Sequence, residues 1–196
     1  AASTVGGNLN ATATLGNITQ GSGALTVTGT SIFRTDADGS NIVLDSASNA
    51  FSSWVKMRAD DGSADATGTN GSETFGNIEF VDRDDVTIQT TADTDADGEL
   101  LIDGSTDGAV GGTLSITATT GDITQGQVLA VTGASTFVVG ATGSNIVLNH
   151  ASNAFSNSVT MKAGTSGNLV FGNITFVDSA AVKFHSSAGT NGDLYI

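Results

Sequence analysis

The sequence predicts an all-β protein, a right-handed parallel β-helix (β-solenoid) built from two tandem repeats. The first observation is a duplication: "SNIVLDSASNAFS" (40–52) and "SNIVLNHASNAFS" (144–156) agree at eleven of thirteen positions. The second is a set of short segments in which apolar and small polar residues alternate, the period of strands with one buried face. The third is a composition with 26 Gly, no Pro and no Cys, which indicates frequent turns and leaves no disulfide framework.

The self-similarity extends over nearly the whole chain. Residues 5–21 return at 110–126, residues 75–82 at 171–178, and residues 98–102 at 192–196. We therefore place repeat unit 1 at 1–104 and repeat unit 2 at 105–196, and expect one continuous solenoid. The second unit is shorter, mostly opposite residues 60–73. Because deletions are tolerated best in surface loops, we interpret that segment as a loop.

The strands expected in the second unit follow one another at short, even spacing. They are 113–119, 129–133, 135–139, 145–149, 158–163, 174–178 and 182–186. The repeated connections read "GNI", "GDI" and "SNI", whereas hairpins favour Asn-Gly or Asp-Gly between paired strands. This favours parallel coils, with Asn49 and Asn153 as inward-turned amides at corners. Two β-sandwich domains are the alternative architecture.

The net charge of −14 argues against nucleic acid and anionic membrane surfaces as partners, because both attract Lys and Arg. No apolar run reaches the ~18 residues of a membrane span, so we expect no membrane insertion. The charge is uneven: unit 1 holds 16 acidic and 4 basic residues, and unit 2 holds 4 and 2. Acidity is therefore a property of one copy and not of the repeated unit.

Three segments of the second unit carry a family resemblance. They are "TLSITATTGDITQG", "LAVTGASTFVVG" and "SNIVLNHASNAFSNSVTM". They resemble the stalk repeats of filamentous-haemagglutinin-type giant adhesins from bacterial surfaces. The resemblance implies a right-handed β-helix, secretion to the extracellular space or cell surface, and a role in adhesion or surface fibres. It carries over no catalytic residue. Nothing in the chain resembles the N-terminal secretion domain of such exoproteins, so the resemblance points to a stalk segment or a filament subunit.

One acidic stretch has the spacing of a calcium loop. "DTDADGELL" (93–101) matches the front half of a D-x-D-x-D-G pattern, in which alternate oxygens converge on one hard cation. The candidate ligands are Asp93, Asp95, Asp97 and Glu99, although the twelfth position is Gly104 instead of the usual Glu. The second unit has no acidic counterpart of Asp93, Asp95 or Asp97, so the fold requires no cofactor; Ca²⁺ is the candidate ligand and a solvated acidic loop the alternative.

The function expected from these features is structural and not enzymatic. Most of the acidic residues that an enzyme would need lie in unit 1 and have no acidic counterpart in unit 2. Placed end to end, the C-terminal "DLYI" and the N-terminal "AASTVGGNL" reproduce the internal junction at 99–114, three residues shorter. We therefore expect the units to continue head to tail in a stiff rod, either covalently within a longer repeat protein or by stacking of separate copies into a filament. The alternative is a module that binds glycan or a host protein through the loops 60–73 and 90–99.

Overall fold

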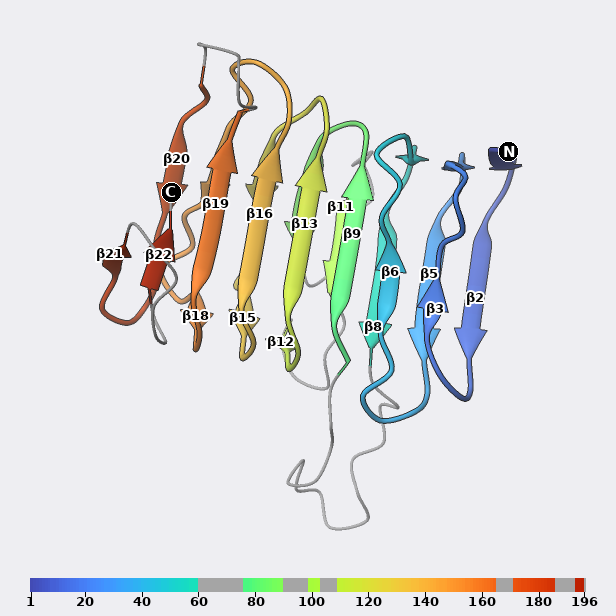
Figure 1. Cartoon of the computed structure of the whole chain (residues 1–196), viewed down its shortest axis with the longest axis horizontal. Helices are drawn as coiled ribbons and strands as arrows, with labels where there is room; N and C mark the ends of the chain where they lie inside the picture. The colour runs from blue at the N-terminus through green and yellow to red at the C-terminus, as the bar shows by residue number, and fades with distance from the viewer. Residues whose placement is uncertain (60–75, 90–98, 103–108, 165–170, 186–192, 196) are drawn as a thin grey trace.

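The computed structural model of the protein is a parallel β-solenoid. It describes residues 1–59, 76–89, 99–102, 109–164, 171–185 and 193–195. In these residues every strand pairing is parallel and no helix occurs. The strands lie side by side along the long axis (Figure 1). The predicted all-β solenoid is thus confirmed. The sandwich alternative is wrong, because sandwiches are built from antiparallel strands.

Two long sheets of eight strands each form the sides of the solenoid. In spatial order, the first long sheet contains β2 (Leu9–Ala13), β5 (Ser31–Thr35), β8 (Val55–Ala59), β11 (Glu99–Ile102), β10 (Val86–Gln89), β14 (Ile123–Gln125), β17 (Ile146–Leu148) and β20 (Ile174–Phe176). The second long sheet contains β3 (Ile18–Thr19), β6 (Ile42–Leu44), β9 (Ile78–Asp82), β13 (Leu114–Ala118), β16 (Ser135–Val139), β19 (Val159–Ala163), β22 (Asp193–Tyr195) and β21 (Lys183–His185).

Each repeat also has a short three-stranded sheet. That of unit 1 contains β1 (Ser3–Val5), β4 (Leu25–Val27) and β7 (Ala50–Phe51). That of unit 2 contains β12 (Ala109–Val110), β15 (Ala130–Val131) and β18 (Ala154–Phe155). A regular coil therefore has three strands, one in each kind of sheet. Stacked partners along the regular coils, such as Leu9 with Ser31 and Ser31 with Val55, are 22 and 24 residues apart.

The core lies inside the solenoid because alternate residues of each strand point inward. The central strands β5, β8, β13 and β16 all have buried residues at their first, third and fifth positions. Phe33, Phe51 and Phe80 stack along the interior, with ring centroids 6.2 and 5.4 Å apart. Unit 2 repeats this aromatic stack with centroids 6.2 and 5.3 Å apart. The duplicated sequence therefore produces duplicated packing.

Homologous strands of the two units nevertheless lie in opposite long sheets. The β2-β5-β8 series belongs to the first long sheet, whereas the matching β13-β16-β19 series belongs to the second. The change occurs at β10 and β11, which both lie in the first long sheet, with β11 inserted between β8 and β10. Unit 1 thus supplies five strands to the first long sheet and three to the second, and unit 2 does the reverse. Only two units together extend both sheets equally.

Candidate self-assembly interface

The two ends of the solenoid are formed by the outer strands of the long sheets. β2 and β3 lie at one end, and β20 and β21 lie at the other (Figure 1). An outer strand presents one row of backbone N–H and C=O groups to whatever lies beyond it. The ends are therefore the surfaces where the stacking of coils can continue.

At the N-terminal end the inward-facing residues are only half-buried. Leu9 and Ala11 of β2 and Ile18 of β3 pack against the core but keep part of their surface exposed, and Ala13 of β2 is also only half-buried. Their counterparts in unit 2, Leu114, Ile116, Ala118 and Ile123, are at most 1 % exposed. A cavity of about 340 Å³ lies at this end, and its lining combines apolar residues with the polar residues Ser3, Thr19, Gln20 and Ser22. The apolar lining residues include Ile18, Leu25, Phe33 and Leu44.

The C-terminal end shows the same difference. Ile174 and Phe176 are half-buried, whereas their counterparts Ile78 and Phe80 are 3 % and 1 % exposed. Val182 is 36 % exposed and its counterpart Val86 is fully buried. Both ends therefore display the residue types that the middle of the rod buries.

The junction between the two repeats shows how an end is covered. There β9 of unit 1 pairs with β13 of unit 2, in a register that joins Ile78 to Leu114 and Phe80 to Ile116. On the other side β10 pairs with β14, joining Val86 to Ile123. The counterpart of β9 is β20 and that of β13 is β2; the counterpart of β10 is β21 and that of β14 is β3. The internal junction is therefore a complete example of the contact that the two ends lack.

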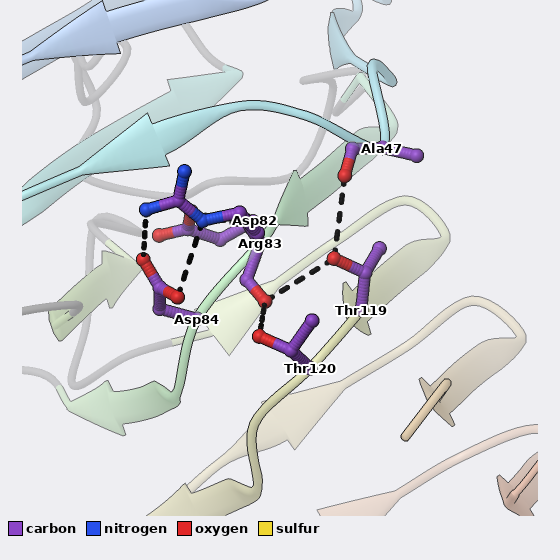
Figure 2. A network of polar contacts seen from close by, with 6 residues as sticks. All are labelled: Ala47, Asp82, Arg83, Asp84, Thr119 and Thr120. Carbon is purple, nitrogen blue, oxygen red and sulfur yellow. Dashed lines mark hydrogen bonds and ion pairs between the residues drawn. The ribbon is translucent and has the colours of Figure 1, made fainter.

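Hydrogen bonds outside the apolar core also join the two units at this junction (Figure 2). Thr120 donates its hydroxyl hydrogen to the carbonyl oxygen of Arg83 at 2.6 Å, and its backbone N–H donates to the same oxygen at 2.7 Å. The Thr119 hydroxyl donates to the carbonyl oxygens of Arg83 at 3.1 Å and Ala47 at 3.2 Å. The Arg83 guanidinium is held aside by Asp84 at 2.9 Å, so it is the backbone of Arg83 that binds unit 2.

Side-chain oxygens of Asn and Asp connect successive coils at the strand starts. Asn77 Oδ1 accepts the N–H of Thr113 at 2.8 Å, and Asp85 Oδ1 accepts the N–H of Asp122 at 2.7 Å. Asn145 Oδ1 in turn accepts the N–H of Asn173 at 2.9 Å. Each oxygen satisfies an amide of the next coil. The repeated "GNI" and "GDI" connections are therefore rungs of a ladder that runs along the rod.

The predicted corner amides are confirmed. Asn49 and Asn153 have no exposed surface. Asn153 Oδ1 accepts the N–H of Leu129 at 3.0 Å, while Nδ2 donates to Val177 O at 3.1 Å and to Gln125 Oε1 at 3.0 Å. Asn49 makes the matching bonds in unit 1. Each amide therefore ties three successive coils together.

Asp82 is the one buried carboxylate in the described part of the core. It ends β9 and has no exposed surface, and its Oδ1 accepts the N–H of Arg83 at 2.7 Å. Its pKa is raised from 3.8 to about 6, mainly by burial and to a smaller extent by the nearby Asp84, against hydrogen bonds from backbone amides including that of Phe51. Its counterpart Asp178 is only half-buried, although it accepts the matching N–H of Phe155 at 3.4 Å. The same motif thus has two environments, and the covering coil makes the difference.

The structure does not describe the side chains of the predicted calcium ligands. Asp93, Asp95 and Asp97 lie outside the described residues, and Glu99 begins β11, whose backbone alone is described. The loop 60–73 and residues 90–98 of the second loop, which were candidates for glycan or host-protein binding, also lie outside. Among the described residues, no group of three or more His, Cys, Asp or Glu side chains is placed to hold a metal ion. The calcium hypothesis therefore stays a prediction.

Comparison with known proteins gives one family match. A family model described as "Repeats of unknown function (DUF5649)" matches residues 1–57 and 83–162. The two matched segments end in the homologous strands β8 and β19, as expected for a tandem repeat. No curated protein and no solved structure matches the chain. In the described residues no helix has the length and apolarity needed to cross a bilayer.

Proposed function

The chain belongs to the family described as repeats of unknown function (DUF5649), and we propose that it is a structural segment of a rod. In this proposal it is part of a secreted bacterial surface fibre or giant adhesin and has no enzymatic activity. Its place is outside the cell or on the cell surface, and its units stack end to end. The observation that carries the proposal is the pair of open ends, whose half-buried apolar residues are the counterparts of residues buried at the internal repeat junction.

The construction of the interior supports a mechanical role. Parallel pairing continues through all eight strands of each long sheet, and buried amides tie neighbouring coils together. In a solenoid each coil contacts only its neighbours, so adding coils lengthens the rod without changing its cross-section. Such a rod holds whatever it carries at a fixed distance from the surface.

Calcium enters the proposal as an optional ligand of unit 1. Asp93, Asp95, Asp97 and Glu99 have the residue types that Ca²⁺ prefers. If they bind the ion, calcium raises the melting temperature of the native chain and loses that effect in Asp95→Ala. Equal melting curves in calcium and in chelator would remove calcium from the proposal.

The alternative function is a module that binds glycan or a host protein through its long loops. It would be favoured by saturable binding on a glycan array by single, unassembled particles. The rod proposal expects straight filaments in negative-stain electron microscopy as protein concentration rises, with no saturable glycan binding. The two measurements together separate the proposals, because a rod segment and a monomeric lectin give opposite results in both.

A further inference from the structure

The open ends of one chain fit each other by translation along the rod. β2 and β20 are the two outer strands of the first long sheet, and β3 and β21 are the two outer strands of the second. A second copy that is translated along the axis therefore places its β2 beside β20 and its β3 beside β21. The second copy does not have to be rotated about the axis to bring the matching long sheets together. This match exists because the two repeats together add eight strands to each sheet.

The internal junction supplies the register of the contact. β9 pairs with β13 through Ile78–Leu114, Glu79–Ser115 and Phe80–Ile116. Transferring these pairs to the homologous strands joins Ile174 to Leu9, Thr175 to Asn10 and Phe176 to Ala11. On the other side the pair Val86–Ile123 becomes Val182–Ile18.

We infer that the chain self-associates head to tail through this register, with the C-terminal end of one copy docked on the N-terminal end of the next. The partner is a second copy of the same chain, and this inference rests on the proposed rod function. The contact buries Ile174, Phe176 and Val182 of one copy against the half-exposed apolar residues and the cavity at the other end. It is the apolar contact of the internal junction, made between molecules.

Charge favours these two ends over the sides of the rod. Residues 1–33 contain no Asp, Glu, Lys or Arg, in a chain whose net charge is −14. At the other end, the charged Glu79, Arg83, Asp84 and Asp85 of the internal junction are replaced by Thr175, Ser179, Ala180 and Ala181. The N-terminal strands β2 and β3 therefore carry no charged side chain, and the segment 174–185 at the other end keeps only Asp178 and Lys183 as charged residues. Lateral contacts would bring the negative charges together, whereas end-to-end contacts avoid most of that repulsion.

The close approach of two glycines at the internal junction defines how tightly the coils fit. A Cβ atom on Gly112 would overlap the carbonyl oxygen of Gly76. The counterpart of Gly112 is Gly7, where an added Cβ meets nothing within 4 Å. Gly7 also lacks a positive φ, so the free chain tolerates a side chain there. In the proposed contact a side chain added at Gly7 overlaps the backbone of Gly172, which is the counterpart of Gly76.

The test uses engineered cysteines, because the native chain has none. The double variant Asn10→Cys/Thr175→Cys places thiols on two exposed residues that the proposed register pairs directly. Paired residues on neighbouring parallel strands lie ~4.8 Å apart, within the Cα range of a disulfide. Within one molecule the two strands are the opposite edges of an eight-stranded sheet, roughly 34 Å apart, so every disulfide must be intermolecular. The mismatched control is Thr14→Cys/Thr175→Cys, whose positions are four residues out of register.

The expected result is a ladder of covalent oligomers on oxidation, formed roughly tenfold faster by the matched pair than by the mismatched pair. Adding Gly7→Val to the matched pair abolishes the ladder, while Thr136→Val, on the outward face of a central strand, leaves it intact. Circular dichroism and sedimentation of each variant establish that it is folded. The reactions are run in ~0.15 M salt, where the Debye length is about 8 Å and repulsion between the acidic molecules is screened.

Three outcomes separate the inference from the proposed function. Filaments with a matched ladder that Gly7→Val removes support both. Filaments in which matched and mismatched pairs cross-link equally overturn this register and leave the rod function standing. Single particles at every concentration, with no ladder, overturn both the contact and end-to-end stacking of separate chains.

Discussion

Replacing Asp82 with Asn tests whether burial of this carboxylate by the neighbouring coil, and not the sequence motif itself, raises its pKa. Asp82 has no exposed surface, and burial raises its pKa from 3.8 to about 6. The folded protein therefore binds the proton more tightly than the unfolded chain does. Stability contributed by protonated Asp82 is fully present below pH ~4 and is lost as the pH rises to about 6.

The pKa difference sets the size of the effect. Each unit of pKa difference corresponds to 1.36 kcal/mol, so a rise from 3.8 to about 6 makes the ionised side chain cost about 3 kcal/mol at pH 7. Asn keeps an oxygen acceptor for the N–H of Arg83 and cannot ionise. Relative to the native chain, the Asp82→Asn variant should thus gain about 3 kcal/mol between pH 4 and pH 7. Any free-energy cost of placing an amide at this position is the same at every pH, so it cancels when the stability difference at pH 7 is compared with that at pH 4.

The assay is urea unfolding at several pH values, followed by the fluorescence of Trp54, the single tryptophan in the chain. Asp178→Asn is the matched control for the substitution itself, because the same motif is only half-buried there. A difference between Asp82→Asn and the native chain that stays constant from pH 4 to pH 7 would refute the reasoning from burial.

Three further substitutions test the packing, two of them with a matched control substitution, and each is measured as the free energy of unfolding in urea. Asn153→Ala should cost roughly 2–5 kcal/mol, because it leaves a buried N–H and a buried C=O of adjacent coils unpaired; Asn157→Ala, which removes one local bond, should cost under ~1 kcal/mol. Gly76→Ala should cost roughly 1–3 kcal/mol, because its Cβ overlaps a carbonyl oxygen of the preceding coil, and Gly7→Ala should be neutral. Phe137→Ala should cost about 3–5 kcal/mol by opening a cavity in a fully buried site. Equal costs within either matched pair, or a loss under ~1 kcal/mol for Phe137→Ala, would contradict the packing described above.

Much of the fold could be predicted from the sequence because a solenoid is made of local, repeated elements. The alternation in 135–139 and 158–163 identified strands with one buried face, and the structure places β16 and β19 there. The "ASNAF" phrases identified the corner amides, because an Asn between apolar residues needs partners when it is buried. The interpretation of the carboxylates at 93–97 as a calcium loop could not be carried further, because their geometry lies outside the described residues.

The inverted order of β10 and β11 could not be predicted from the sequence. Alternation shows which residues of a strand point inward, but it does not show which sheet the strand joins or which strand lies beside it. Asp82 illustrates the same limit, since "FVD" occurs in both repeats and only the first copy buries its carboxylate.

The all-β class, the two repeats and the inward-facing residues could be predicted from the amino-acid order, because they depend on neighbours along the chain. The structure was needed to show that homologous strands occupy opposite sheets, that two repeats restore the register, and that the outer strands at the two ends match. These properties depend on which coil lies against which. That contact brings together residues distant in sequence, and local periodicity carries no information about it.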